Sequence, residues 1–242
     1  MAKRTFNLDT VEGSNSINQV IKKQNKTLIE HAYSVMRHDI ITGALKPGEK
    51  LRVAHLQKKY AVSASTLRES ISRLVSEYLV VAEGQRGYKV SDINIDELND
   101  ITDLRVLIEI NAVRESVRQA TTQWKQDLTD TFNQLSELEQ PIDPENADKW
   151  EALNARFHLL LSNGKPSPWT QRTLYLLSQH SERYRHLAIK ISQNHRDVHA
   201  EHKTIYDAVM EGNELRAALA IEDHIRATTR QIINRYIVKE GT

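Results

Sequence analysis

The segment from Leu51 to Val90 constrains the fold more than any other part of the chain. Two short helices are predicted on either side of a tight turn at residues 61–63, the second helix running from about Ser65 to Tyr78. That helix repeats apolar residues at the i, i+3/i+4 spacing of one buried face: Leu67, Ile71, Leu74 and Val75. Ser63 is placed to cap its N-terminus. The pattern therefore predicts a helix-turn-helix.

The opposite face of the second helix carries hydroxyl and guanidinium groups, on Ser65, Thr66, Arg68, Ser72 and Arg73. Such groups donate hydrogen bonds to phosphates and base edges, and small side chains let a helix enter a major groove. Residues 79–90 then form two β-branched segments around a Gly-Gln-Arg-Gly turn, which is typical of a hairpin. A hairpin at this position is a wing with Arg86 at its tip. The segment predicts a DNA-binding winged helix, although amphipathic helix pairs also occur in proteins that never touch DNA.

Four stretches resemble the DNA-binding domain of the GntR family of bacterial transcription regulators. They are Gly43-Ala-Leu-Lys-Pro-Gly-Glu-Lys-Leu51, Val62-Ser-Ala-Ser-Thr-Leu-Arg-Glu69, Arg73-Leu-Val75 and Arg86-Gly-Tyr-Lys-Val90. Members of that family commonly carry Arg where this chain has Ala54 and Ala64, so Arg52, Lys58 and Lys59 become candidates for phosphate contacts. The expected DNA-binding residues are Arg52, Ser63, Ser65, Thr66, Arg68, Arg73, Arg86 and Gly87.

Charge is distributed unevenly along the 242 residues, although the whole chain carries only +1. Residues 1–94 hold 15 Lys and Arg against 9 Asp and Glu, whereas residues 95–242 hold 18 against 23. A basic front half suits a partner with phosphates. The chain has no cysteine, which fits the cytoplasm, and no apolar run long enough for a membrane helix. We expect a flexible tail over residues 1–25, a winged helix-turn-helix domain over 26–94 and an all-helical effector-binding and dimerisation domain over 95–242.

The rear half has the periodicity of helices throughout. Residues 96–120 contain no Gly or Pro and carry Leu98, Ile101, Leu104, Leu107, Ile108 and Val113. Further helices are predicted at residues 122–138, 145–161, 169–192, 195–210 and 213–238, with Pro or Gly in the breaks at 139–144, 162–168 and 211–212. The predicted fold class is therefore mostly α, with an N-terminal winged helix-turn-helix and a C-terminal all-α bundle of six to seven helices.

Four polar residues of the rear half are placed to converge. Asn154 and His158 are four apart on one helix face, while His202 precedes the Gly212 turn by ten residues and His224 follows it by about as many. Two antiparallel helices would bring His202 and His224 to the same height. Histidine is a frequent metal ligand, but a lone helical histidine is more often a core or surface residue. A rival set, His195, His199 and His202, is predicted to be a solvated face.

The rear half resembles the FCD effector domain of the FadR-type branch of GntR regulators. The stretches that carry this resemblance are Asp103-Leu-Arg105 with Glu109, Leu153-Asn154, Phe157-His158, Glu201-His202, Gly212-Asn213 and Asp223-His224. In many such domains one Asp and three His bind Zn²⁺, or another divalent ion such as Ni²⁺ or Mn²⁺, and a carboxylate effector completes the coordination. The resemblance places His158, His202 and His224 at the histidine positions and Asn154 at the Asp position. An amide is a poorer ligand than a carboxylate. Without a metal, the same cluster could hold a carboxylate through its imidazoles.

Three further residues are candidates for binding an organic acid. Arg105 lies in an apolar stripe and needs an anionic partner, which is either a ligand carboxylate or Glu109 at i+4. Arg183 and Tyr184 are similar candidates, with a surface location as the alternative.

The predicted function is a homodimeric transcription regulator, in a family whose members most often repress, that binds a double-stranded DNA operator under the control of a small carboxylate. One alternative is a constitutive DNA-binding protein with a purely structural rear domain. Another is a metal-dependent hydrolase, which is disfavoured because the sequence places no acid beside the histidines as a general base and contains no nucleophile motif.

Overall fold

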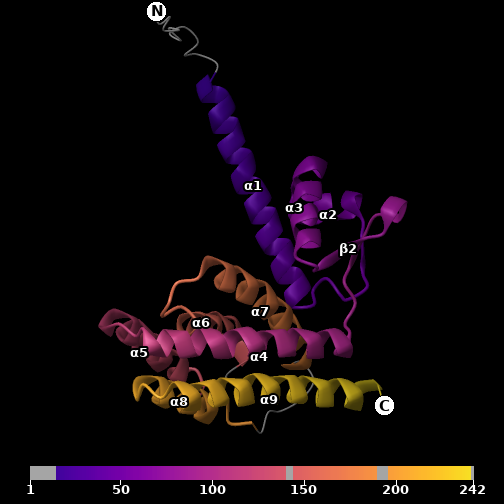
Figure 1. Ribbon diagram of the computed structural model, residues 1–242. Helices are drawn as coiled ribbons and strands as arrows, with labels where there is room; N and C mark the ends of the chain where they lie inside the picture. Colours follow the sequence, from indigo (N-terminus) through magenta and orange to yellow (C-terminus); the bar gives the residue numbers. More distant parts are fainter. Residues whose placement is uncertain (1–14, 140–143, 190–195, 241–242) are drawn as a thin grey trace, which may run out of the picture. The chain divides into compact units, whose positions relative to one another are not determined.

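The computed structural model describes residues 15–139, 144–189 and 196–240. Two compact units divide the chain, one formed by Ala44–Ser91 with the residues up to Ile40, the other by Ile41–Gly43 with the residues from Asp92 onward (Figure 1). Within the described residues no helix is long and apolar enough to cross a membrane.

The first unit is a winged helix-turn-helix. Helices α1 (Asn15–Ile41), α2 (Val53–Tyr60) and α3 (Ala64–Ser76) are followed by the strands β2 (Val80–Ala82) and β3 (Tyr88–Val90). The predicted wing hairpin forms, with a 3₁₀ turn at Gly84–Arg86 between its strands. A third strand, β1 (Lys50–Leu51), pairs antiparallel with β3, so the sheet order is β1-β3-β2.

One apolar core holds this unit together. Met36 and Ile40 of α1 meet Leu56 of α2 and the buried stripe of α3. The stripe is the one that the sequence predicts: Leu67, Ile71 and Leu74 are fully buried, and Val75 packs against them in part. Burial of each such side chain stabilises the fold by roughly 1.5–3 kcal/mol, so the apolar stripe fixes which face of α3 is left exposed.

The second unit consists of six α-helices and one 3₁₀ turn, at Pro144–Asn146, among its described residues. The helices are α4 (Ile95–Arg118), α5 (Thr122–Glu137), α6 (Ala147–Leu161), α7 (Pro168–Ile189), α8 (Val198–Met210) and α9 (Glu214–Glu240). Helices α4 and α9 lie antiparallel side by side (Figure 1), and ion pairs from Asp103 to Arg226 and from Arg118 to Glu214 link them in opposite chain directions. The prediction of a mostly helical chain with a winged helix is confirmed.

Three expectations differ from the structure. Helix α1 begins at Asn15, inside the stretch 1–25 that was expected to be a flexible tail, because residues 15–25 contain no Gly or Pro to stop it. Residues 1–14 of that tail lie outside the described residues. Strand β1 was not predicted, since two residues carry no periodicity. Leu104 and Leu107 belong to the predicted apolar stripe of α4, yet they are 43% and 70% exposed. The stripe is wider than the face that α9 and α7 cover.

Candidate functional site

Helix α3 presents the polar face that the sequence predicts. Ser63 caps the helix, its Oγ accepting the Thr66 N–H at 3.1 Å. The Ser63 hydroxyl also lies 2.9 Å from those of Ser65 and Thr66, so the three form one hydroxyl cluster at the helix start. Arg68 is exposed one turn further along. The turn before α3 is tight because Ala61 takes a left-handed conformation, with φ 53°.

The remaining candidates for DNA contacts differ in exposure and in whether they form ion pairs within the unit. Arg52, just before α2, and Arg86, in the wing turn, are both exposed. Gly87 follows at φ 94°, a conformation open to glycine. Arg73 is half-buried and lies 3.7 Å from Glu30 of α1, which makes it part of an ion pair within the unit. Lys59 likewise pairs with Asp39, at 2.7 Å.

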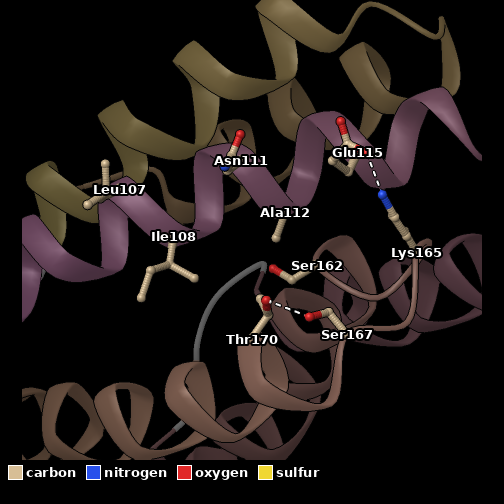
Figure 2. Close-up of a pocket in the computed structure, with 9 residues that line it drawn as sticks. All are labelled: Leu107, Ile108, Asn111, Ala112, Glu115, Ser162, Lys165, Ser167 and Thr170. Carbon is tan, nitrogen blue, oxygen red and sulfur yellow. Dashed lines mark hydrogen bonds and ion pairs between the residues drawn. The ribbon is translucent and has the colours of Figure 1, made fainter.

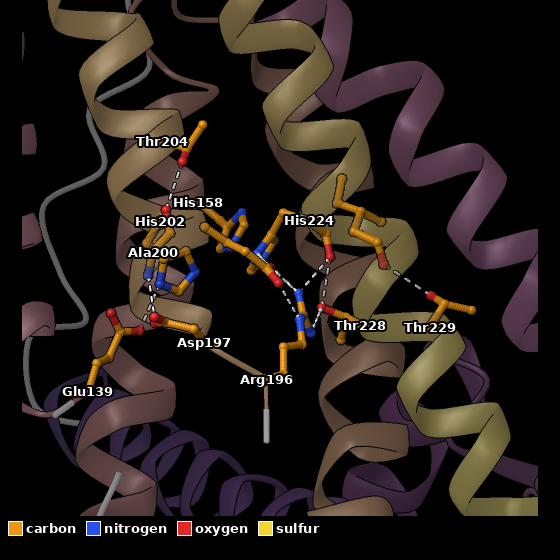
Figure 3. A network of polar contacts seen from close by, with 12 residues as sticks. Glu139, His158, Arg196, Asp197, Ala200, His202, Thr204, His224, Thr228 and Thr229 are labelled. Carbon is orange, nitrogen blue, oxygen red and sulfur yellow. Dashed lines mark hydrogen bonds and ion pairs between the residues drawn. The ribbon is translucent and has the colours of Figure 1, made fainter. Parts of the chain in front are cut away.

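In the second unit the three predicted histidines meet inside the bundle (Figure 3). His158 comes from α6, His202 from α8 and His224 from α9. Their potential ligand nitrogens all lie within 4.8 Å of one another. The ring centroids of His202 and His224 are 4.7 Å apart. The antiparallel turn between α8 and α9 thus brings the two rings to matching heights.

Each imidazole of this histidine cluster has a carboxylate behind it. His202 Nδ1 lies 2.7 Å from Glu139, and His224 Nδ1 lies 2.8 Å from Glu201. His158 Nδ1 lies 3.6 Å from Oε2 of Glu109. The carboxylates come from the end of α5, from α8 and from α4.

The electrostatics of the cluster favour the neutral forms of His158 and His224 and the charged forms of Glu109 and Glu139. Burial lowers the pKa of His158, and it lowers that of His224 well below the usual value. Burial alone would raise the pKa of Glu109, but Arg105 and His158 outweigh it and hold that pKa at about 2. Burial also opposes the charge on Glu139, but His202, Trp150 and His199 together outweigh it and lower the pKa of this carboxyl.

Two buried atoms without hydrogen-bond partners are suited to be metal ligands. An ionised carboxylate only accepts hydrogen bonds, so Nδ1 of His202 must carry a proton, and in the neutral imidazole Nε2 then keeps its lone pair. Within the described residues that Nε2 is buried and has no hydrogen-bond partner, and the same holds for Oδ1 of Asn154. Buried polar atoms are rarely left unpaired. Three imidazole nitrogens within 4.8 Å are a donor set that suits Zn²⁺ and similar ions.

The predicted effector-binding residues lie inside the second unit. Arg105 is 6% exposed and its Nε donates to Glu109 at 2.8 Å. Of the two anionic partners considered, a ligand carboxylate and Glu109, the structure therefore shows Glu109. Arg183 is 1% exposed, which excludes the surface alternative. Tyr184 is equally buried; its hydroxyl lies 2.9 Å from the carbonyl oxygen of Asn94, the N-cap of α4.

A separate pocket of about 540 Å³ is lined on one side by α4 (Figure 2). It lies between α4 and the connection from α6 to α7, with an ion pair from Lys165 to Glu115 along one wall. Neither the histidine cluster nor the predicted effector-binding residues line it.

The sequence argument missed the carboxylates. It found no acid beside the histidines, whereas Glu109, Glu139 and Glu201 all lie there, each as a hydrogen-bond or ion-pair partner of an imidazole. Arg196 was also missed; it donates to Glu201 and to the carbonyl oxygen of His224. In the rival histidine set, His202 is fully buried, so that set is not a solvated face, and His195 lies outside the described residues.

A winged helix-turn-helix joined to a helical unit with a buried polar cluster defines a class of protein, the modular DNA-binding transcription regulator. Comparisons with known proteins agree. Residues 28–90 match the bacterial regulatory proteins of the gntR family, and residues 100–227 match the FCD domain. The chain belongs to the GntR family and carries an FCD domain. It is a DNA-binding transcription regulator rather than an enzyme.

Individual relatives support the same assignment. The chain is 32% identical over 206 residues to the uncharacterized HTH-type transcriptional regulator BphR of Paraburkholderia xenovorans, covering 84% of each chain. It is 30% identical over 198 residues to the HTH-type transcriptional repressor GlaR of Escherichia coli, covering 80% of this chain and 90% of GlaR. The solved structure of E. coli McbR/YncC has the same fold, with a TM-score of 0.71 at 20% identity over 86% of this chain and 98% of that one.

Proposed function

We propose that this regulator is a cytoplasmic repressor whose affinity for its operator is set by a small organic acid bound at the histidine cluster. The observation that carries the proposal is the convergence of three imidazoles, from three helices, in the interior of the second unit. A purely structural core gains nothing from such a group, because buried polar atoms cost free energy unless they are paired. The relative GlaR is named a transcriptional repressor, which supports repression rather than activation.

The residues that would hold a divalent ion are His158, His202 and His224, with Asn154 as a fourth donor. A bound ion would supply a positive Lewis-acid centre to which a carboxylate can bind. The protein's own part is to keep His158 and His224 neutral through burial, and to orient His202 and His224 through Glu139 and Glu201.

Helix α4 offers a route from this site towards the DNA-binding unit. Glu109 of α4 contacts His158, and α4 begins at Ile95, five residues after β3 ends at Val90. The hydroxyl of Tyr184 is bonded to Asn94 at the start of the same helix. A ligand that draws the histidines together therefore acts on a helix that follows the wing in the chain. Repression is relieved by a shift between two arrangements of that helix.

The regulator acts as a homodimer on this proposal. One winged helix gives too little contact for a specific site, whereas two half-sites add their free energies. The second unit also leaves large apolar side chains uncovered, since Leu107 is 70% exposed on α4 and Leu219 is 66% exposed on α9. Exposed apolar surface of this kind is what a second copy would cover.

Binding of a DNA fragment from upstream of the protein's own gene tests the DNA-binding residues. Arg68→Ala removes an exposed guanidinium from α3 and should weaken binding by about tenfold to a hundredfold, the usual cost of losing a base or phosphate contact. Arg216→Ala is the matched control, because Arg216 is an exposed arginine of the second unit. Fluorescence anisotropy measures both. Unchanged affinity in Arg68→Ala would remove α3 from the interface.

The effector is tested in the same assay with a panel of small carboxylates, before and after treatment with a chelator. Release of the operator by one acid supports the proposal, and loss of that release with chelator places the acid at a metal. An operator complex that no acid alters favours the constitutive DNA-binding protein instead.

A further inference from the structure

The carboxylates behind the histidine cluster differ in how their charge is neutralised. Glu201 forms an ion pair with Arg196, whose Nε donates to Oε1 at 2.6 Å and whose terminal nitrogen also contacts Oε2. Glu109 is paired with Arg105 at 2.8 Å. Two of the three negative charges therefore meet a guanidinium directly.

Glu139 is different. Its side chain is fully buried, and its ion-pair partners among the described residues are only His202 and His199. The remaining hydrogen bond comes from the indole N–H of Trp150, at 3.1 Å. Among the described residues no Lys or Arg pairs with this carboxylate, while its hydrogen bonds from His202, Trp150 and His199 favour the charged form. The site therefore carries a negative charge that no ammonium or guanidinium group of the described residues balances.

We propose that Glu139 and Glu201 are positioning residues for a metal ion, and that Glu139 also supplies the negative charge that Asn154 does not. This inference rests on the metal site of the proposed function. Each carboxylate accepts the Nδ1–H of its histidine and so turns the Nε2 lone pair towards the other two rings. Glu201 acts mainly through this orientation, because Arg196 already balances its charge. Glu139 acts through orientation and charge together.

Glutamine separates the two effects. It has nearly the same shape as glutamate and still accepts a hydrogen bond from Nδ1–H, but it carries no charge. Glu139→Gln should therefore weaken Zn²⁺ binding by about tenfold to a hundredfold, the range seen when a partner of a metal-bound histidine is lost. Glu201→Gln should cost less, about threefold to tenfold, because Arg196 already balances that charge and only the weaker hydrogen bond from Nδ1–H to a neutral amide oxygen is felt. Glu137→Gln, the same change at an exposed site on α5, should cost nothing.

The experiment uses the full chain stripped of metal and titrated with Zn²⁺ against a chromogenic chelator. Circular dichroism of the metal-free variants checks that each one is folded. Visible absorption of the Co²⁺-loaded forms adds a spectroscopic readout, because a misdirected imidazole changes the ligand field, whereas a merely structural role for Glu139 leaves the spectrum alone. Glu139→Asp keeps the charge and should recover part of the affinity lost in Glu139→Gln.

The outcomes separate this inference from the function on which it rests. If wild type binds no Zn²⁺, the metal site itself is refuted and the positioning roles fall with it. If wild type binds Zn²⁺ and Glu139→Gln binds it equally well with the same Co²⁺ spectrum, only the inference is overturned. Should Glu139→Gln not fold, Glu201→Gln decides, because Glu201 is partly exposed and its loss is better tolerated: weaker binding supports the inference and unchanged binding overturns it.

Discussion

At the scale of single residues, Asn154 stands at the position where the FCD resemblance predicts a metal-binding Asp. Its side chain is 5% exposed and its Oδ1 has no partner among the described residues. A neutral amide oxygen is a weaker ligand than a carboxylate for a divalent ion. Asn154 therefore offers a buried, uncharged oxygen one turn before His158 on α6.

Restoring that charge should strengthen metal binding. We expect Asn154→Asp to raise the affinity for Zn²⁺ by about tenfold or more, since a carboxylate adds direct attraction to the ion in a buried site. The measurement is chelator competition on the metal-stripped chain. Asn133→Asp, which adds the same charge at an exposed position of α5, is the control. Equal affinities for Asn154→Asp and wild type would show that residue 154 is not a ligand.

Sequence could reach the three histidines but not the groups that orient them. His202 and His224 were found because their distances from the Gly212 turn match, which is a property of the local chain. Glu139 meets His202 across 63 residues of sequence, and that contact depends on where the end of α5 packs against α8. No periodicity encodes such a meeting, so only tertiary structure reveals it.

At the scale of elements, the junction of α1 with α2 is stabilised by an ion pair that depends on pH. Asp39 of α1 accepts hydrogen bonds from Lys59 and Tyr60 at the end of α2, both at 2.7 Å. Burial alone would raise the pKa of Asp39, but these bonds outweigh it and lower the pKa below its ordinary 3.8. A carboxyl whose pKa is lowered on folding stabilises the fold above its unfolded value, and this contribution is lost as the pH falls through the folded value.

Asp39→Asn should therefore destabilise the first unit by about 1 kcal/mol at neutral pH, because partly exposed charged hydrogen bonds contribute on that order. The difference in free energy of unfolding between wild type and variant should stay constant down to about pH 5 and vanish below that. Urea unfolding followed by far-ultraviolet circular dichroism measures it. Tryptophan fluorescence is the control, since Trp124, Trp150 and Trp169 all lie in the second unit and their transition should not move. A gap that persists in acid would mean that the charge of Asp39 contributes nothing.

The helices themselves were largely readable from sequence. Helices α5, α6 and α8 end a few residues before Pro141, Gly164 and Gly212, because such residues cannot continue a helix at low cost. The exposure of Leu107 was not readable. An apolar stripe indicates that a helix face is suited to burial. How much of that face is buried within one chain depends on how many neighbouring helices pack against it.

At the scale of the whole molecule, two separate apolar cores make the units distinguishable in a melting experiment. Met36 and Leu67 belong to the core of the first unit, and Phe157 and Ile205 to that of the second. All three tryptophans report on the second unit, which also holds the histidine cluster. A ligand that binds only the folded cluster raises the stability of that unit by mass action.

Zinc should therefore raise the midpoint of the tryptophan transition. At a free Zn²⁺ concentration one hundred times the Kd, the expected gain is about 2.7 kcal/mol, or about 5–10 °C for a unit of this size. His202→Ala should abolish the zinc-induced rise whatever its own starting midpoint, whereas His31→Ala, at an exposed position of the first unit, should preserve it. A rise that survives in His202→Ala would place the ion elsewhere. A transition of the first unit that moves together with the tryptophan signal would be direct evidence that occupancy of the cluster is felt by the DNA-binding unit, which the proposed regulation requires.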